Sequence, residues 1–290
     1  MIETDLHKCV LCPNECGADR YIRAGKCLAT DKITVARADL HFFEEPCVSG
    51  KNGSGTVFFS GCSMSCVFCQ NHSISARLKG RDVTVCGLAE IFEDLEGRGA
   101  HNINLVTPTH YAVQIIEALK LRKPSVPVIY NTSGYEKREV ITLLKDYIDV
   151  YLTDFKYALS ATAKELSGRF DYPATAAAAV REMIDTKGVP VYDSDGMIRS
   201  GVIIRHLVVP SYIADSIKVL ELIAERFKDK ALISIMSQYT PLKELNLPDK
   251  INRPLTPLEY KIVIKKAREL NLDGYIQELD SSGTAYIPEF

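Results

Sequence analysis

Short apolar segments alternate with longer amphipathic segments from residue 56 onward, and this alternation limits the possible fold more than any other feature of the sequence. Such alternation is typical of βα units built around a parallel sheet. The predicted strands are residues 56–60, 102–107, 126–131, 150–155, 201–209 and 232–237. The predicted helices between them are residues 87–96, 111–122, 137–146, 175–187 and 213–227. Six strand-helix repeats predict an α/β fold, a partial (β/α)6 barrel of the TIM type.

Three further elements are predicted around these repeats. A last helix over residues 257–270 has Thr256 as its N-cap and Pro257 at its first position. Residues 274–279 are a candidate seventh strand. Residues 189–198 predict a β-hairpin that turns at Asp195-Gly196.

Length and charge favour one large domain with an appendage and exclude several classes of partner. The chain has 290 residues, of which 46% are hydrophobic, enough for a substantial core. Its 35 basic and 37 acidic residues form no long run of one sign, which indicates neither a nucleic-acid surface nor an anionic membrane. The first eight residues lack the apolar core of a signal peptide, and no stretch approaches the ~18 apolar residues of a spanning helix. We therefore expect a soluble cytoplasmic protein.

All nine cysteines lie at or before Cys86. A reducing cytosol disfavours structural disulfides, so clustered thiols indicate metal ligands or reactive groups. Five of the nine fall within residues 1–52, which end in a Gly-Ser-rich connector. The sequence thus predicts a small Cys-rich metal-binding lobe over residues 1–52 and a core domain over residues 53–290.

Three cysteines, Cys62, Cys66 and Cys69, directly follow the first predicted strand with the spacing Cys-x3-Cys-x2-Cys. The small residues between them suit a tight loop, and three thiolates can bind one face of a cubane cluster. Ferredoxin clusters have four cysteine ligands, whereas a catalytic metal site keeps one position open for substrate. A zinc knuckle or three unrelated buried thiols are the alternatives. The position after a strand favours a cluster with one free iron.

This motif, with Phe68 in its aromatic place, resembles the signature of the radical SAM superfamily. In that superfamily the free iron binds the amino and carboxylate groups of S-adenosylmethionine (SAM). An electron from the reduced cluster then cleaves the sulfonium to a 5′-deoxyadenosyl radical. The resemblance implies that Cys62, Cys66 and Cys69 hold a catalytic [4Fe–4S] cluster and that Phe68 belongs to the cofactor site. From about residue 56 onward the chain is most similar to pyruvate formate-lyase activating enzymes and their relatives.

Polar residues at the carboxyl ends of the predicted strands are candidates for SAM binding, because ligands of parallel sheets bind there. The second strand ends in Thr107-Pro108-Thr109-His110, where many superfamily members carry Gly-Gly-Glu. Thr107 and Thr109 offer oxygen acceptors in its place. A similar Thr-Pro-Thr-His stretch occurs in a subgroup of uncharacterised activating-enzyme homologues. Asn131 and Thr132, after the third strand, resemble the ribose-binding pattern of activating enzymes.

The later strands end in charged residues. Asp154 and Lys156 resemble the Asp-x-Lys motif of activating enzymes, in which Asp positions the cofactor and Lys pairs with its carboxylate; an ordinary salt bridge is the alternative. Arg205 lies where the family has an arginine near cofactor and substrate, and His206 should face the opposite side of the sheet. Gln238 and Tyr239 are candidates for substrate or adenine contacts, or part of an ordinary strand-to-loop transition.

The spacing Cys9-x2-Cys12-x3-Cys16-x10-Cys27 in the N-terminal lobe indicates a second metal site. Zinc and an auxiliary [4Fe–4S] cluster both satisfy four cysteines, and free thiols remain the alternative. The motif resembles the N-terminal extension of the same homologue subgroup. Cys47 and Cys86 stand apart and are expected to be core thiols.

The resemblance implies a radical SAM oxidoreductase similar to glycyl-radical-enzyme activases, which removes hydrogen from a protein or peptide substrate. It also implies an electron donor of the flavodoxin or ferredoxin type and anaerobic chemistry. A small-molecule substrate is the first alternative, since fold does not fix function. The second is an iron–sulfur electron carrier that does not use SAM.

Overall fold

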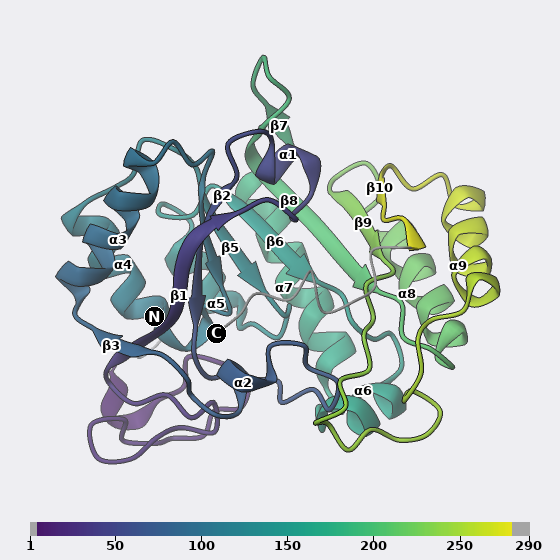
Figure 1. Ribbon diagram of the computed structural model, residues 1–290, viewed down its shortest axis with the longest axis horizontal. Helices are drawn as coiled ribbons and strands as arrows, with labels where there is room; N and C mark the ends of the chain where they lie inside the picture. The colour runs from purple at the N-terminus through teal and green to yellow at the C-terminus, as the bar shows by residue number, and fades with distance from the viewer. Residues whose placement is uncertain (1–4, 280–290) are drawn as a thin grey trace.

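The structure is a computed structural model that describes residues 5–279, and its centre is one sheet of largely parallel strands (Figure 1). The parallel strands are β2 (Ser54–Phe59), β4 (Ile103–Val106), β5 (Val128–Thr132), β6 (Val150–Asp154), β8 (Ile198–Leu207), β9 (Leu232–Met236) and β10 (Gly274–Ile276). All six predicted strands and the candidate seventh are therefore confirmed, with ends that differ by a few residues.

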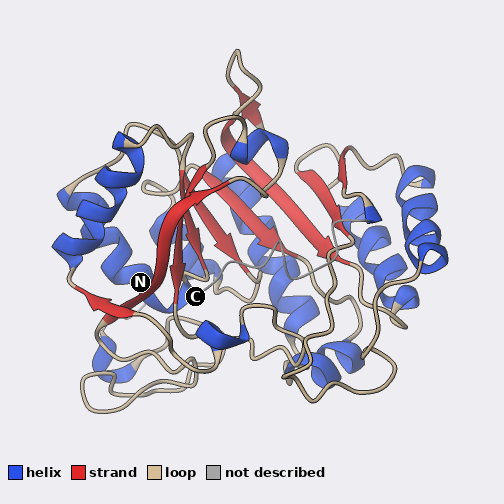
Figure 2. Cartoon of the chain, viewed as in Figure 1, coloured by secondary structure: helices blue, strands red, loops and turns tan. Residues whose placement is uncertain are grey.

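The sheet is open. Its strand order is β10-β9-β8-β6-β5-β4-β2-β1-β3, so within residues 5–279 its two edges do not pair with each other (Figure 2). The prediction of a partial barrel is confirmed. β2, β4 and β6 are almost entirely buried, as expected of parallel strands covered on both faces.

Two antiparallel strands extend the sheet beyond β2. β1 (Ile33–His41) pairs with β2, and β3 (Arg81–Val83) pairs with β1. Residues 33–41 fall inside the predicted N-terminal lobe, but they form a strand of the main sheet. Only Ile33 and Val35 of β1 are fully buried, so the alternation that marks a strand is weak in the sequence.

Helices cover the outer face of the sheet, as the βα rhythm predicts (Figure 1). They are α3 (Val85–Gly97), α4 (Ala112–Leu121), α5 (Arg138–Leu144), α7 (Tyr172–Lys187), α8 (Ile213–Arg226) and α9 (Pro257–Glu269). Thr256 caps α9 in a reciprocal capping box with Glu259, confirming its predicted start. α6 (Ser160–Ser167) was not predicted, because it buries mostly small residues and has no strong apolar periodicity.

Shorter elements complete the chain. β7 (Val191–Tyr192) pairs antiparallel with the start of β8, which confirms the hairpin, and Gly196 takes the turn with φ of 77°. α1 (Pro46–Ser49) follows β1, and α2 (His72–Ser75) follows the cysteine triplet. Two 3-10 helices span Leu6–Lys8 and Thr109–Tyr111. No helix in the part of the chain that the structure describes is long and apolar enough to cross a membrane.

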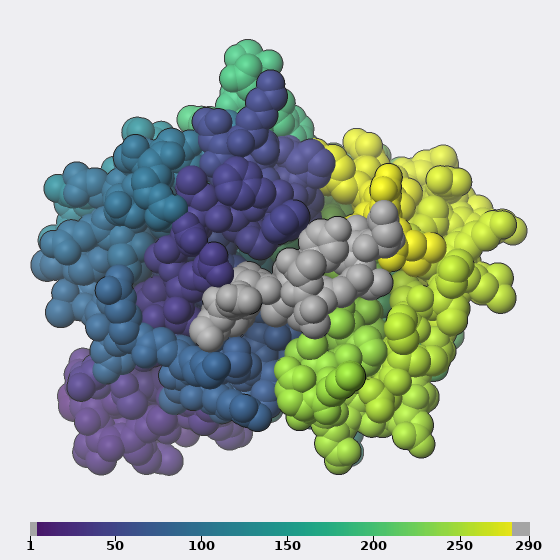
Figure 3. Space-filling view, viewed as in Figure 1, coloured from purple at the N-terminus to yellow at the C-terminus, as the bar shows by residue number. Residues whose placement is uncertain are grey.

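The first cysteine-rich segment, residues 5–32, protrudes at one end of the molecule (purple in Figure 3). It packs against the loop that follows β2: the Cys62 amide donates to the Cys27 carbonyl at 3.1 Å, and Asn14 Nδ2 donates to the Ser63 carbonyl at 2.8 Å. The two cysteine groups of the sequence are therefore neighbours in space.

Candidate active site

A cavity of about 440 Å³ lies at the carboxyl ends of the parallel strands and extends across the open face of the sheet. This volume suits a cofactor-sized ligand. Most residues predicted for the cofactor site line the cavity, namely Cys62, Cys66, Phe68, Cys69, Thr107, Asn131, Thr132, Asp154, Lys156 and Arg205. Residues from five different strand ends thus meet at one cavity because the strands are parallel.

Backbone geometry places the cysteine triplet on the cavity wall. Gly61 begins the turn after β2 with φ of 89°, and a Cβ there would lie 2.4 Å from the Cys27 carbonyl oxygen. Ser65 also has a positive φ, of 61°. The sequence places glycine at the turn because any larger residue would be strained and would collide with the N-terminal segment.

Each sulfur of the triplet accepts at least one hydrogen bond. The donors are the Met64 amide to Cys62 at 3.4 Å, the Tyr157 hydroxyl to Cys66 at 3.9 Å and the Ser75 hydroxyl to Cys69 at 3.4 Å. Such donors stabilise thiolates that ligate a metal centre.

Burial raises the pKa of the Cys66 thiol to about 12 and raises that of Cys69 as well. These thiols need a bound metal to ionise near neutral pH, since a coordinating thiol is deprotonated by its metal. Three cysteines that line a cavity and whose sulfurs accept hydrogen bonds suit a cluster with one open iron.

Asp154 and Lys156 form a half-buried ion pair beside Cys66. Burial opposes the charge on Lys156, but Asp154 and Cys66 together hold the pKa of Lys156 above its ordinary range. The Lys156 amide also donates to the Tyr172 hydroxyl at 2.9 Å, which fixes the backbone. The pair is an ion pair, which the sequence raised as one alternative, and it also lines the cavity. Its role toward a cofactor stays a prediction.

Thr107 carries backbone strain at the cavity wall. Its φ is 59°, which is rare for a β-branched residue, and its amide donates to the Asn131 carbonyl at 2.9 Å. Strain of this kind concentrates at functional sites.

Thr109 does not reach the cavity. Its hydroxyl donates to the Glu136 carboxylate at 2.6 Å, and Thr132 donates to the same oxygen. Glu136 was not predicted from the sequence. It is fully buried, its other carboxylate oxygen has no partner within residues 5–279, and burial raises its pKa to about 7.

Alternation along β8 separates Arg205 from His206, as predicted. Arg205 lines the cavity, whereas His206 is buried and its Nδ1 lies 2.8 Å from the Phe155 carbonyl. Gln238 also lines the cavity. Tyr239 does not; its hydroxyl donates to the Ile251 carbonyl at 2.8 Å, and its ring packs on Phe68.

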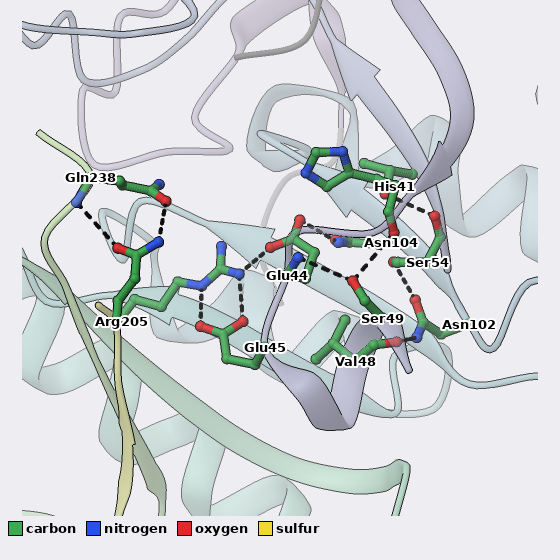
Figure 4. A network of polar contacts seen from close by, with 12 residues as sticks. His41, Glu44, Glu45, Val48, Ser49, Ser54, Asn102, Asn104, Arg205 and Gln238 are labelled. Atoms are coloured by element: carbon green, nitrogen blue, oxygen red, sulfur yellow. Dashed lines mark hydrogen bonds and ion pairs between the residues drawn. The ribbon is translucent and has the colours of Figure 1, made fainter. Parts of the chain in front are cut away.

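Sequence reasoning missed a group of polar residues at the opposite end of the cavity from the triplet. Glu44 and Glu45, from the loop between β1 and α1, pair there with Arg205, and His41 lies nearby (Figure 4). The adjacent carboxylates in Glu44-Glu45-Pro46 were the available signal, but nothing in the sequence connects them to a residue 160 positions later.

The four N-terminal cysteines surround one another away from the cavity. Electrostatic coupling links Cys27 to Cys9, Cys12 and Cys16, and the Cys16 and Cys27 sulfurs lie within 3.5 Å of where a Gly25 Cβ would be. Backbone amides of Asn14, Ala18, Lys26 and Ala29 hydrogen-bond to the thiols of Cys12, Cys16 and Cys27. Within residues 5–279 no three His, Cys, Asp or Glu side chains converge tightly enough for a single ion.

Arg20 is fully buried beside these thiols. It donates to the carbonyls of Thr30 and His110, and its guanidinium lies 4.0 Å from Cys9 Sγ. No carboxylate of residues 5–279 pairs with it, although an uncompensated buried charge is costly.

The two remaining cysteines differ: Cys47 is a buried core thiol, as predicted, but Cys86 is exposed, so its prediction was wrong.

Comparisons with known proteins agree with this geometry. The sequence model of the radical SAM superfamily matches residues 56–198. An uncharacterized protein of Methanocaldococcus jannaschii is 30% identical over 276 residues, which cover 91% of this chain and 75% of the relative.

Two solved structures share the fold. A radical SAM methyltransferase from Sphaerobacter thermophilus superposes with a TM-score of 0.54 at 14% identity, covering 97% of this chain and 87% of that one. Streptococcus suis SuiB bound to S-adenosylmethionine gives a TM-score of 0.53 at 16% identity, over 79% of this chain and 51% of SuiB. This chain thus spans about half the length of SuiB. With these matches, the sequence motif and the open parallel sheet, the chain belongs to the radical SAM superfamily.

Proposed function

We propose that this protein holds a [4Fe–4S] cluster on Cys62, Cys66 and Cys69 and cleaves SAM reductively to generate a 5′-deoxyadenosyl radical. One observation carries the proposal: three sulfurs, each with a hydrogen-bond donor behind it, face the same cavity as Asp154, Lys156, Thr107 and Asn131. When bound, the cluster and SAM supply the electron transfer and bond cleavage, and the protein supplies position and charge.

The residues on the cavity wall have distinct proposed roles. Lys156 pairs with the SAM carboxylate and Asp154 fixes the lysine. Strained Thr107 presents its backbone where other superfamily members carry a glutamate. Asn131 and Thr132 hold the ribose, and Phe68 packs beside the cofactor. Thr109 acts indirectly, because its hydroxyl and that of Thr132 meet on Glu136.

The proposed substrate is a protein or peptide from which the radical removes hydrogen, in the manner of a glycyl-radical-enzyme activase. SuiB, which shares the fold with a TM-score of 0.52, has been crystallised with the precursor peptide SuiA, and this supports a peptide. A small-molecule substrate is the alternative. We further propose a cytoplasmic enzyme, reduced by a flavodoxin- or ferredoxin-type donor.

We also propose that Cys9, Cys12, Cys16 and Cys27 bind a second metal, either an iron–sulfur cluster or zinc. Four thiolates around a cation form a net negative centre, which would compensate the buried charge of Arg20. Amide donors to the sulfurs also suit metal-bound thiolates. Besides cysteines, the buried apolar side chains of residues 5–32 are only Leu6, Leu11, Ala18 and Ala29, so a metal would contribute to the folding of this segment.

Anaerobic reconstitution with iron and sulfide, followed by dithionite and SAM, tests the main proposal. We expect 5′-deoxyadenosine, detected by liquid chromatography and mass spectrometry. Its absence from protein that carries a reducible cluster would refute SAM cleavage and leave the electron-carrier alternative.

A further inference from the structure

At the end of the cavity opposite the cysteine triplet, two glutamates share one arginine. Arg205 Nε donates to Glu45 Oε1 at 2.8 Å, its second nitrogen donates to Glu45 Oε2 at 2.5 Å, and the same nitrogen pairs with Glu44. The side chains are nearly buried, with 12% of Arg205, 9% of Glu44 and 5% of Glu45 exposed. Figure 4 shows both carboxylates directed at the guanidinium from the loop before α1.

The loop that carries the two glutamates is held in place. The Glu44 amide donates to Ser49 Oγ at 3.0 Å, and Ser49 Oγ donates to the His41 carbonyl at 3.2 Å. Asn102 Nδ2 anchors the following helix by donating to the Val48 carbonyl at 2.7 Å. Because the loop is fixed, the carboxylates form a preorganised site.

This end of the cavity carries an excess of one negative charge. Two carboxylates face one guanidinium, and Arg205 holds the pKa of Glu45 below its ordinary value although burial opposes this. Burial lowers the pKa of the neighbouring His41, so the histidine is neutral near pH 7 and does not offset the excess. Elsewhere in the cavity, Asp154 and Lys156 cancel each other.

The proposed cofactors do not remove this excess. An oxidised [4Fe–4S] core with three thiolates would carry one net negative charge. SAM bound through a neutral amine and its carboxylate would carry no net charge, because the sulfonium balances the carboxylate. The cofactors would therefore add no positive charge that offsets Glu44 and Glu45.

Hydrogen-bond acceptors are also in excess here. Asn104 is completely buried on β4, and its Nδ2 donates to Glu44 Oε1 at 3.0 Å. Its Oδ1 has no partner within residues 5–279. A buried acceptor without a donor costs free energy, and this one lies beside a carboxylate. The excess carboxylate charge and the unpaired Asn104 oxygen both favour a ligand that carries hydrogen-bond donors and a positive charge.

We propose that Glu44 and Glu45, positioned by Arg205, bind a guanidinium or primary ammonium group of the substrate at the end of the cavity opposite the cluster. The inference rests on the proposed function only in that the same cavity holds the cofactor. It names the substrate class: a molecule with a cationic nitrogen group, from an arginine or lysine side chain or from a free amine. An anionic substrate would meet like charge in a nearly buried site, which is strongly unfavourable.

Binding of n-butylguanidinium tests the site, with n-butylurea as its neutral isostere. Thermal unfolding of the cluster-reconstituted, SAM-loaded protein is followed anaerobically by circular dichroism. We expect n-butylguanidinium at about ten times its Kd to raise Tm by roughly 2–4 °C, and n-butylurea to raise it by much less. Equal shifts for the two compounds would overturn the proposal, and this comparison needs no variant.

Glu44→Gln keeps the shape and removes the excess charge, so it should weaken n-butylguanidinium binding at least tenfold. Glu221→Gln, at an exposed carboxylate paired with Lys266, is the matched control and should bind as the wild type does. Unchanged binding by Glu44→Gln would contradict the proposal.

Blocked tripeptides Ala-Arg-Ala and Ala-citrulline-Ala distinguish the sources of the cation. A shift with the arginine peptide alone supports a peptide substrate, and a shift with n-butylguanidinium but neither peptide supports a free amine or guanidine. Formation of 5′-deoxyadenosine is measured in the same preparations. Protein that forms it without discriminating the two probes would refute the cation site alone. Protein that discriminates the probes without forming it would refute SAM cleavage alone.

Discussion

The two cysteine groups of this protein are neighbours, yet their surroundings differ. Cys62, Cys66 and Cys69 line the large cavity, and each sulfur accepts at least one hydrogen bond. Cys9, Cys12, Cys16 and Cys27 do not line it; they lie near one another beside a buried arginine. Structural metal sites are closed by four protein ligands, whereas catalytic sites keep one position open. The comparison therefore supports the proposal that the triplet serves chemistry and the N-terminal group serves stability.

The largest expected effect follows from changing the triplet that lines the cavity, Cys62, Cys66 and Cys69. Cys66→Ala should reduce 5′-deoxyadenosine formation to background, because two cysteines cannot retain the cluster in a SAM-binding state. The assay is anaerobic turnover with dithionite and SAM, with iron and sulfide content measured in parallel. Cys86→Ala, at the exposed cysteine, is the control and should keep wild-type activity. Undiminished formation of 5′-deoxyadenosine by Cys66→Ala would refute the proposal that the triplet ligates the cluster.

Substitutions among the four N-terminal cysteines should affect metal content and stability more than the formation of 5′-deoxyadenosine. The double variant Cys9→Ser, Cys12→Ser should lose the second metal and about 2–5 kcal/mol of stability, since metal binding is coupled to folding. Elemental analysis for iron and zinc, together with chemical denaturation, measures both quantities. A metal content equal to that of the wild type would remove the second site. Loss of iron identifies a cluster and loss of zinc identifies a structural ion.

Lys156 tests whether the half-buried ion pair serves the cofactor. Lys156→Met should raise the SAM concentration for half-maximal 5′-deoxyadenosine formation about 10- to 100-fold, equivalent to about 1.4–2.7 kcal/mol of lost charge pairing. Lys266→Met, at a half-buried lysine that pairs with Glu221 far from the cavity lining, serves as the control. An unchanged SAM requirement would leave the pair with a structural role only.

The smallest expected effect on turnover concerns Glu136, which accepts hydrogen bonds from Thr109 and from the cavity residue Thr132. Burial raises its pKa to about 7, above the ordinary value of 4.5, so the folded state holds the proton more tightly than the unfolded state. Stability should therefore fall as pH rises from about 4.5 through 7 and then level off.

Glu136→Gln should remove this pH dependence and stabilise the protein at pH 8 by about 3 kcal/mol. Urea denaturation of both proteins at pH 5 and pH 8 measures the difference. Equal pH profiles for the two proteins would show that Glu136 is ionised in the fold.

Most of the fold and the cluster end of the cavity were predictable, because their signals are local. The six parallel strands follow from short apolar runs, and the triplet follows β2 within a few residues. Thr107, Asn131, Asp154 and Arg205 come together because parallel strands end at the same edge of a sheet. Their predicted roles in SAM binding remain predictions.

Other features depend on contacts between distant segments. β1 was not predicted from the sequence. Few of its residues are fully buried, so the apolar alternation that marks a strand is weak there. Thr109 has the right residue type at a strand end, but Glu136 engages its hydroxyl away from the cavity.

The sequence by itself determined where the cysteine triplet lies and that strand ends surround it, since spacing within a short loop and alternation along strands are properties of neighbouring residues. Only the tertiary structure decided that the N-terminal cysteines pack against the cluster loop and that Glu44 and Glu45 meet Arg205. Those contacts join residues far apart in the chain, and they exist because the open sheet brings the loop before α1 and the end of β8 to one cavity.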